Sequence, residues 1–331
     1  MAPYVAKRDA MLKQFISIHF PQGAESLESM PGDAGLRSYH RLISGGTSYI
    51  VMDCPPTYCD VKQFIDIAIY LKNKGFSTPE IIGQDLGQGF LILEDFGTLS
   101  VKDYLLGSLD QGELKHKQTY HLIIDLLVLL QEQEIPSTLV EFDNELLILE
   151  LGVFVDWYIP YAYNRKLSAH EFEEFIDIWQ HILAEQVPMP NSIVLRDYHV
   201  ENMMYLEQRE SIRQLGLLDF QDAVFGSPVY DLVSVLEDAR LEISRDEALQ
   251  YVEYFAQKKK IEVESLLRNY HILGAQRNSR ILGVFARKVN QDGDDSYLKY
   301  IPRVLKYLEY DLSYFVLEPL RHWLEKLKLS L

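Results

Sequence analysis

The sequence predicts an α+β fold of two lobes, with a small mixed β-sheet in the N-terminal lobe and a larger, mainly helical lobe after it. Short β-type runs broken by glycine fill the first third of the chain. Long helical patterns dominate from about residue 99 onward. The length of 331 residues, set against about 150 residues per domain, suggests two units. We therefore expect one lobe over residues 1–97 and a second over residues 98–331.

The first lobe is predicted to begin with a hairpin. The runs Ser38–Leu42 and Thr47–Asp53 flank a pair of glycines, which is typical of two strands joined by a tight turn. Val61–Gly75 carries apolar residues at helical spacing and stops at a glycine suited to a helix C-terminus. Gly89–Gly97 is expected to be a buried strand that runs into a polar turn.

The second lobe is predicted to be mainly helical. Helical periodicity is long and regular in Leu114–Glu134 and His170–Glu185, and the tail from Pro319 has one apolar face suited to packing. Two short β-like runs, Ser192–Asp197 and Leu215–Phe220, interrupt the helices. Each carries an aspartate near its carboxyl end, a rigid place to hold a reactive group.

Composition limits the partners and the compartment. The 32 Lys and Arg against 49 Asp and Glu give a net charge of −17, which repels nucleic acid and anionic membrane surfaces. Two cysteines, Cys54 and Cys59, cannot build a disulfide framework for a chain of this size, so a reducing compartment fits. With no signal-peptide core and no long apolar run, the chain is expected to be cytoplasmic.

The central motif is LRDYHVENMMYL, in which Asp197 and Asn202 stand five positions apart. That is the spacing of the kinase catalytic loop, where the aspartate accepts the proton of the acceptor hydroxyl and the asparagine oxygen binds magnesium. Asp219, 22 positions after Asp197, suits the second magnesium ligand. Each residue alone would be read as a turn or cap residue. Together, in this order, they predict phosphoryl transfer from ATP with Mg²⁺.

Other polar residues near the motif have more modest interpretations. Asp231 is expected to cap a helix or to brace the catalytic loop, and Asp222 is ambiguous in the same way. His199 titrates near neutrality, yet a loose phosphoryl transition state needs positioning more than a strong base. We therefore expect His199 to hold the loop by hydrogen bonding within the lobe.

The letters DFG occur at Asp95–Gly97 but about a hundred residues before the catalytic loop, whereas the metal-binding triplet of protein kinases follows it. Glu94, Asp95 and Phe96 are better interpreted as the interlobe connection. Their backbone groups are then placed to pair with an adenine edge.

With these motifs the chain resembles the aminoglycoside phosphotransferase and choline kinase-like superfamily, which has the two-lobed protein-kinase fold. More narrowly, it is similar to bacterial cell-wall-recycling sugar kinases that phosphorylate the anomeric hydroxyl of N-acetylmuramate and N-acetylglucosamine. The resemblance spans residues 32–287, most of the chain. It is carried by the segments GDAGLRSYHRL, VMDCPP, GFLILEDFG, LGVFVDWYIP, RDYHVENMM, LLDFQDAVFGSPVYDLVSVLEDAR and QRNSRILGVFAR.

The resemblance implies that Asp197 is the catalytic base, that Asn202 and Asp219 bind Mg²⁺, and that a turn covers the ATP phosphates. The residues of this turn are Gly32, Asp33 and Gly35. The chain departs from the family at Leu195, where a histidine is usual and only a structural hydrogen bond is lost.

A second departure concerns the phosphate-binding lysine. Met52 stands where many kinases place that residue. Arg37 or Arg41, on the neighbouring strand, could supply the missing charge, because arginine suits bidentate phosphate contact. The sequence does not decide between them.

Residues for the acceptor are harder to place. Trp157 and Tyr158 could pack on a sugar ring, although they suit a lobe core equally well. Gln276, Arg277 and Asn278 form a polar group, and Arg277 could pair with the carboxylate of an acid such as muramate.

Two rival functions remain open. Acceptor specificity lies in variable helical segments, so the acceptor could be another hydroxylated metabolite or an aminoglycoside. Met52 also motivates a nucleotide-binding pseudokinase, against which the full set of Asp197, Asn202 and Asp219 argues. The acceptor and the oligomeric state stay undetermined.

Overall fold

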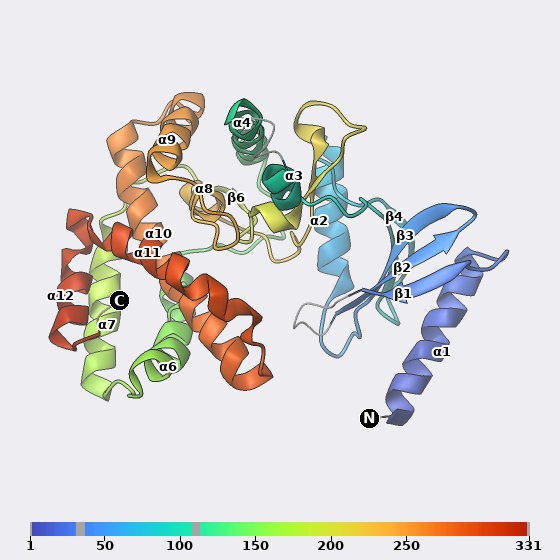
Figure 1. Cartoon of the computed structure of the whole chain (residues 1–331), viewed down its shortest axis with the longest axis horizontal. Coiled ribbons are helices and arrows are strands. Elements are labelled where there is room, and N and C mark those ends of the chain that lie inside the picture. The colour runs from blue at the N-terminus through green and yellow to red at the C-terminus, as the bar shows by residue number, and fades with distance from the viewer. Residues whose placement is uncertain (1, 31–36, 108–112, 330–331) are drawn as a thin grey trace. The chain divides into compact units, whose positions relative to one another are not determined.

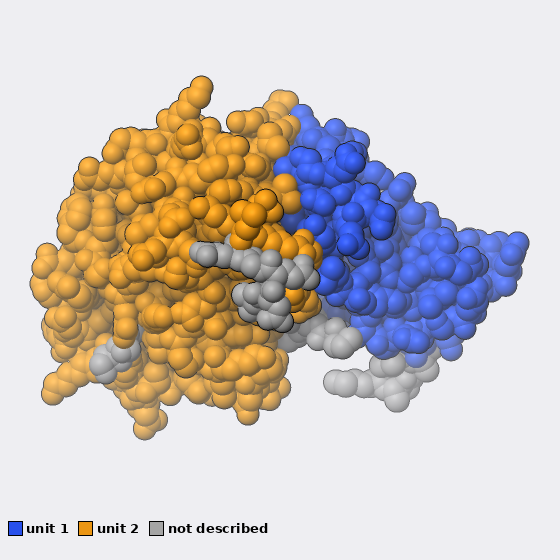
Figure 2. Space-filling model, turned by 45° about the horizontal axis from the view of Figure 1, so that its top comes forward, with its two compact units in different colours: residues 1–99, 204–222 blue, residues 100–203, 223–331 orange. Residues whose placement is uncertain are grey.

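The structure is a computed structural model that describes residues 2–30, 37–107 and 113–329. The chain divides into two compact units, coloured separately in Figure 2. Unit 1 comprises residues 1–99 and 204–222, and unit 2 comprises residues 100–203 and 223–331. The segment 204–222 thus groups with the N-terminal part, although the sequence places it in the second lobe. The assignment of a nucleotide-binding and a catalytic lobe remains a prediction.

Unit 1 contains a five-stranded antiparallel sheet (Figure 1). Its strands in spatial order are β1 (Ser26–Ser29), β2 (Ser38–Ser44), β3 (Thr47–Asp53), β5 (Phe90–Glu94) and β4 (Ile81–Asp85). The predicted hairpin is present as β2 and β3. Gly45 and Gly46 turn between them with φ of 60° and 72°, the left-handed pair that a two-residue hairpin turn requires. The sequence missed β1, which is polar, and β4, whose register is irregular.

Helix α1 (Ala2–His19) packs against one face of this sheet (Figure 1). The core between them consists of Leu12, Phe15, Ile16, Leu42, Val51, Phe90 and Ile92. Because side chains alternate along a strand, Arg41 and Met52 point to the opposite face. The predicted helix after the hairpin is α2 (Val61–Asn73), whose first turn is capped by Asp60.

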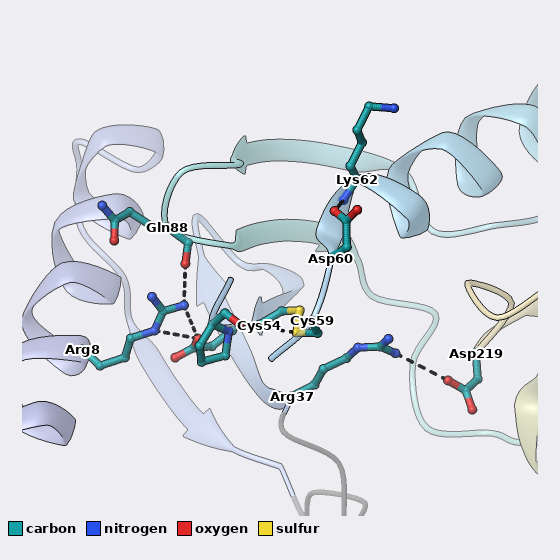
Figure 3. Close-up of a disulfide and its surroundings, with 10 residues drawn as sticks. Arg8, Arg37, Cys54, Cys59, Asp60, Lys62, Gln88 and Asp219 are labelled. Atoms are coloured by element: carbon teal, nitrogen blue, oxygen red, sulfur yellow. Dashed lines mark hydrogen bonds and ion pairs between the residues drawn. A yellow bond between two sulfur atoms is a disulfide. The ribbon is translucent and has the colours of Figure 1, made fainter. Parts of the chain in front are cut away.

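A short loop follows β3 and is closed by a disulfide between Cys54 and Cys59, with Cα atoms 5.9 Å apart (Figure 3). The bridge spans five positions, so it closes one short loop. It is not the framework of several disulfides that the sequence excludes. Gly89 lies against this loop with φ of 71°, and a Cβ there would approach the Cys54 carbonyl oxygen to 1.9 Å. Arg8 of α1 pairs with Asp53 beside the loop, its Nε lying 2.9 Å from Oδ1. The loop is therefore tied to both the sheet and α1.

Unit 2 is mainly helical, as predicted. Its α-helices are α3 (Val101–Gly107), α4 (Glu113–Gln131), α5 (Asn144–Glu150), α6 (Ile159–Tyr163), α7 (Ala169–Ala184), α8 (Val229–Leu236), α9 (Arg245–Lys259), α10 (Val263–Arg287), α11 (Ile301–Leu312) and α12 (Glu318–Lys326). The π-helical segments are η2 (Phe154–Tyr158) and η5 (Lys288–Asp292), and the 3₁₀ segments are η3 (Val200–Asn202), η6 (Asp295–Tyr300) and η7 (Phe315–Leu317). Helix α10 contacts α8, α9, α11 and η2 and forms the centre of the unit.

The helices predicted from periodicity are confirmed as α4, α7 and α12, with ends that shift by a few residues. Helix α7 begins at a capping box in which Ser168 and Glu171 bind each other's backbone N–H. The two β-like runs are shorter than expected. Strand β6 (Ser192–Val194) pairs with β9 (Val224–Gly226), and β8 (Leu215–Leu217) pairs with β7 (Met203–Tyr205).

The helical run Asn144–Tyr163 is, among the described residues, long and apolar enough to cross a membrane, although the sequence indicated no such stretch. Acidic residues interrupt it, and Glu150 pairs with Arg280 of α10, Nε to Oε2 being 3.0 Å. Phe154 stacks on Phe175 of α7 with ring centroids 6.2 Å apart. These contacts make the run part of the packing of unit 2.

A buried polar network lies between α8, α10 and α11. Asn278 donates from Nδ2 to Glu237 at 2.6 Å and to Asp311 at 3.0 Å, and all three side chains are almost fully buried. His271 contacts Asp311 at 3.0 Å. Burial lowers the pKa of His271 to about 4, so at neutral pH this contact is a hydrogen bond of a neutral imidazole. Gly274 is required here, because a Cβ would approach the Asp311 carboxylate to 2.6 Å.

We expect this network to make stability fall as pH rises above the ordinary pKa of a glutamate. Burial, followed by repulsion from Asp311, raises the pKa of Glu237 well above its ordinary value. The folded state then keeps a proton that the unfolded chain releases above about pH 4.3, so the free energy of unfolding decreases with pH up to the folded-state pKa. Glu237→Gln should flatten this decrease by at most about 1.4 kcal/mol per pH unit. Urea unfolding of both proteins at a series of pH values above about 5 measures the slope, and the titration of His271 is common to both.

The difference between wild type and variant reports on the coupled pair Glu237 and Asp311, because Asp231, whose pKa burial raises to about 7, titrates in both proteins. The groups facing the acidic pair are Tyr270, His271 and Asn278 from α10, Arg245 from α9, and Tyr307 and Tyr310 from α11. Equal slopes in the two proteins would show that Glu237 is ionised in the folded state.

Candidate active site

The residues of the predicted catalytic loop lie in unit 2 directly after β6. Arg196 adopts φ of 70°, a left-handed conformation that is uncommon outside glycine and frequent at functional sites. Asp197 follows, and its N–H donates to the Leu195 carbonyl at 2.9 Å while its carbonyl accepts from the His199 N–H at 3.1 Å. The loop thus turns tightly at Asp197, whose side chain is half-buried.

Asn202 ends the short helix η3 and closes the loop. Its Nδ2 donates to the Asp197 carbonyl oxygen at 3.0 Å. Because the amide nitrogen is used within the loop, the amide oxygen is the atom left to face a ligand, and this is the atom that a hard cation prefers.

Asp231 of α8 braces the start of the loop through hydrogen bonds to its backbone. Its carboxylate accepts the N–H of Leu195 at 2.6 Å and of Arg196 at 2.9 Å. Pro228, not Asp231, is the N-cap of α8. Of the two roles the sequence left open for Asp231, the structure shows the brace. Burial raises the pKa of this carboxyl to about 7 against the opposing effect of its backbone hydrogen bonds.

A second brace, which the sequence did not reveal, holds the other end of the loop. Asp238 is fully buried and accepts the Val200 N–H at 3.2 Å. Arg240 contacts Asp238 at 3.6 Å and donates to Glu201 at 3.0 Å. Lys102 of α3 also pairs with Glu201. Asp238 and Arg240 belong to the sequence LEDAR. The opposite charges of these two residues, two positions apart, were the sequence feature that could have indicated this brace.

His199 is buried within the loop. Burial lowers its pKa well below the ordinary value, and the cations Arg240, Arg277 and Lys102 lower it further. A neutral imidazole of this kind is a poor proton acceptor at neutral pH, which supports the structural role. Its Nδ1 has no hydrogen-bond partner among the described residues, so the expected hydrogen bond is not seen at that atom.

Asp219 lies in unit 1, two residues after β8. It adopts φ of 55°, which places it among the few described non-glycine residues with left-handed backbone. Its carboxylate is 45% exposed and accepts from Gln221 Nε2 at 2.7 Å. Arg37 Nη1 approaches the same oxygen to 3.9 Å, as Figure 3 shows. Asp219 and Arg37 therefore share one surface of unit 1.

Arg41 is engaged elsewhere. Its Nε donates to Asp95 at 2.7 Å, and its Nη2 donates to the Gly97 carbonyl oxygen at 3.0 Å. Ser48 also donates to Asp95, at 2.5 Å. Burial acts to raise the pKa of Asp95, but the hydrogen bonds from Arg41, Ser48 and Gly97 outweigh it and lower the pKa. The arginine thus fixes the Asp95–Gly97 turn.

The other residues of that turn are held by the segment 204–222. Arg209 pairs with Glu94 and lies over the Phe96 ring, 5.1 Å from its centroid. Phe96 packs on Gly216, where a Cβ would come within 2.7 Å of the ring. These contacts explain why the turn groups with β7 and β8. Gly32, Asp33 and Gly35, expected to cover phosphates, lie outside the described residues.

Met52 is 1% exposed on β3, opposite Tyr39 and Leu91 of the neighbouring strands. It is a packing residue on the sheet face that Arg41 shares. The position is filled by an apolar side chain, so a phosphate-binding cation has to come from another residue.

The two aromatic residues expected to bind the acceptor differ in their burial. Tyr158 is buried and stacks on Phe154 with centroids 5.3 Å apart, so it is a core residue. Trp157 is only half-buried and lies in the π-helical segment η2, a type of distortion often found at functional sites.

The three polar residues predicted as a group on α10 have different surroundings. Gln276 donates to the Leu147 carbonyl oxygen at 2.8 Å and Asn278 belongs to the buried acidic network, so neither points to the catalytic loop. Arg277 is 2% exposed, and its Nε and Nη1 have no hydrogen-bond partner among the described residues. Burial lowers its pKa, which Tyr230, Asp197 and Asp238 act to raise. Arg277 is thus a buried cation near the predicted base.

The donors present suit a nucleotide-bound cation better than a protein-only metal site. In the described parts of the chain, no three or more His, Cys, Asp or Glu side chains are grouped to hold a metal. The amide oxygen of Asn202 and the carboxylate of Asp219 are hard oxygen donors. Magnesium commonly binds through one or two such groups together with substrate phosphates, so the residues fit it.

A five-stranded sheet in one unit and a helical unit with a braced Asp197–Asn202 loop define the class of kinase-like phosphotransferases. The chain belongs to the phosphotransferase enzyme family, whose model matches residues 26–265. It is 31% identical to the N-acetylmuramate/N-acetylglucosamine kinase of Caulobacter vibrioides over 97% of each chain. It is 30% identical to the kinase of that name from Neisseria meningitidis serogroup B, over 91% of this chain and 90% of the relative.

Solved structures share the fold. The chain resembles choline kinase LicA from Streptococcus pneumoniae with a TM-score of 0.63 and 15% identity, over 91% of this chain and 99% of that one. For ADP-bound aminoglycoside phosphotransferase APH(2'')-Ib the TM-score is 0.62 and the identity 14%, over 90% and 97% of the two chains. The predicted protein-kinase-like α+β fold is confirmed.

Proposed function

We propose that this chain is an ATP- and magnesium-dependent kinase that phosphorylates the anomeric hydroxyl of an N-acetylated amino sugar. The observation that carries the proposal is the loop in which Asp197 and Asn202 are fixed by Asp231 and Asp238. The printed name of the relatives, N-acetylmuramate/N-acetylglucosamine kinase, supports the choice of acceptor.

In this proposal the acceptor oxygen attacks the γ-phosphorus of ATP, the bond from that phosphorus to the β,γ-bridging oxygen breaks, and ADP leaves. Asp197 accepts the proton of the hydroxyl. Asn202 and Asp219 would hold magnesium, which would neutralise phosphate charge. The two braces keep Asp197 in place, which matters because this chemistry depends on positioning.

Arg37 is the better candidate for the missing phosphate cation, since Arg41 is occupied by Asp95. We expect Arg37→Ala to weaken ATP binding by roughly 10- to 150-fold, the range of a lost charge-assisted contact of about 1.5–3 kcal/mol, and to leave adenosine binding nearly unchanged. Titration calorimetry with both ligands measures the difference.

Arg41→Ala, four positions further along the chain in β2, serves as the matched variant. Its loss should disturb the Asp95–Gly97 turn and therefore weaken ATP and adenosine alike. If Arg37→Ala fails to separate ATP from adenosine, another group carries the phosphate contact.

We further propose that Arg277 recognises an anionic group of the acceptor. A buried guanidinium with unpartnered nitrogens is costly, and a substrate carboxylate beside Asp197 would satisfy it. Arg277→Gln should raise KM for N-acetylmuramate at least about 10-fold and change KM for N-acetylglucosamine little, because only the former carries a carboxylate. Equal losses in kcat with both sugars would instead indicate that Arg277 positions Asp197.

An ATP-consumption assay with these two sugars, simple sugars, choline and aminoglycosides tests the activity itself. Use of an aminoglycoside or choline in preference to the amino sugars would replace the proposed acceptor. Met52 favours the pseudokinase alternative, and a chain that binds ATP but consumes none with any acceptor would establish it.

A further inference from the structure

Gln221 occupies an unusual position between two aspartates in the segment after β8. Its side chain is 2% exposed, so its amide must find partners within the protein. Nε2 donates to Asp219 Oδ1 at 2.7 Å and to Asp222 Oδ2 at 3.1 Å. Because carboxylates only accept hydrogen bonds, the amide must present its nitrogen to both and cannot flip.

The backbone around Asp219 is fixed separately from its side chain. Phe220 is fully buried and stacks on Phe64 of α2, with ring centroids 5.0 Å apart. Asp219 itself has the left-handed φ of 55°. With the main chain anchored in this way, the orientation of the carboxylate depends on the groups that bind its oxygens, and Gln221 is one of them.

The role of Asp222 follows from its exposure. Its carboxylate is exposed, so it can be hydrated without cost, yet it accepts the second N–H of the Gln221 amide. This contact leaves the amide nitrogen no freedom to turn away from Asp219. The three residues form a line in which Asp222 holds Gln221 and Gln221 holds Asp219.

We propose that Gln221 is a positioning residue that aims Asp219 at the divalent cation of the nucleotide, with Asp222 as the anchor of its amide. This inference rests on the proposed function, because it presumes that Asp219 is a metal ligand. Groups that hydrogen-bond a ligating carboxylate fix its direction, and their loss typically weakens metal binding about 10- to 100-fold.

The test uses Mn²⁺ as a paramagnetic probe, with free Mn²⁺ measured by electron paramagnetic resonance at saturating ADP. Gln221→Met keeps the length of the side chain and removes the donor, so the Mn²⁺ dissociation constant should rise about 10- to 100-fold. Asp222→Ala should give a smaller rise. The double variant should bind Mn²⁺ no more weakly than Gln221→Met alone, because both changes act through the same hydrogen bonds of the Gln221 amide. Gln208→Met, at an exposed position of the same unit, should bind like wild type.

An unchanged Mn²⁺ affinity in Gln221→Met overturns the proposal, and so does an additive loss in the double variant, which would mean that Asp222 acts without Gln221. If Gln221→Met does not fold, the exposed Asp222→Ala decides alone, and wild-type affinity in that variant contradicts the anchor. A wild-type chain that binds neither ADP nor Mn²⁺ would refute the kinase proposal as a whole. Binding in wild type with no effect of Gln221→Met would refute only the positioning role.

Discussion

Asp197→Asn is expected to lower turnover with the best acceptor at least about 100-fold and to leave ATP binding nearly intact, since the amide keeps the shape of the carboxylate but cannot take the proton. The loop should survive the change, because its hydrogen bonds to Leu195, His199 and Asn202 use the backbone of residue 197 and not its side chain. Steady-state kcat and the ATP dissociation constant, measured on the same preparation, give both quantities.

Asp177→Asn is the control, as it makes the same chemical change at an exposed position of α7 in the same unit. It should match wild type in turnover. Near-native turnover of Asp197→Asn would assign Asp197 a structural role and leave the proton to another group.

The fold could be predicted where periodicity is strong and was missed where it is weak. The hairpin, α4, α7 and α12 have regular apolar spacing and clear end signals, such as the capping box at Ser168. Strand β1 reads Ser-Leu-Glu-Ser and is mostly exposed, so it has no apolar pattern to detect. Its place in the sheet comes from pairing with β2, which is a tertiary effect.

Some residues of the candidate site could likewise be predicted from the sequence, and others could not. The spacing of Asp197, Asn202 and Asp219 is a local sequence property, and it singled out the residues on which the proposed chemistry depends. The braces were harder to find, because Asp238 lies 38 positions from the Val200 N–H that it accepts. The choice between Arg37 and Arg41 also needed coordinates. The contacts of Arg41 with Asp95 and Gly97, across 54 and 56 positions, show that this arginine is already engaged.

Burial explains the remaining differences. Gln276 and Asn278 flank Arg277 and look alike in a sequence, yet adjacent helical positions point in different directions. On a helix buried on all sides, each of the three meets a different neighbour: the Leu147 carbonyl, the acidic network, or the surroundings of Asp197. A polar run on a central helix therefore does not predict one polar site.

Asp219→Ala is expected to abolish the effect of magnesium on nucleotide affinity. The carboxylate is the charged protein ligand in the proposed site, and its removal should cost more than the loss of Gln221, hence more than about 100-fold in the magnesium-dependent part of ATP binding. Titrating ATP with and without Mg²⁺ gives the enhancement as a ratio of two dissociation constants. That ratio should fall to about one in the variant, because ATP binding without the metal does not use Asp219.

Removal of Asp219 also frees Arg37 from a nearby negative charge, so metal-free ATP should bind the variant as well as or better than it binds wild type. Opposite changes with and without Mg²⁺ cannot come from general unfolding, which would weaken both. Glu207→Ala, an exposed acidic position of the same unit, controls for net charge and should retain the full enhancement. A wild-type enhancement in Asp219→Ala would remove this carboxylate from the metal site, and with it the reason to assign Gln221 a role there.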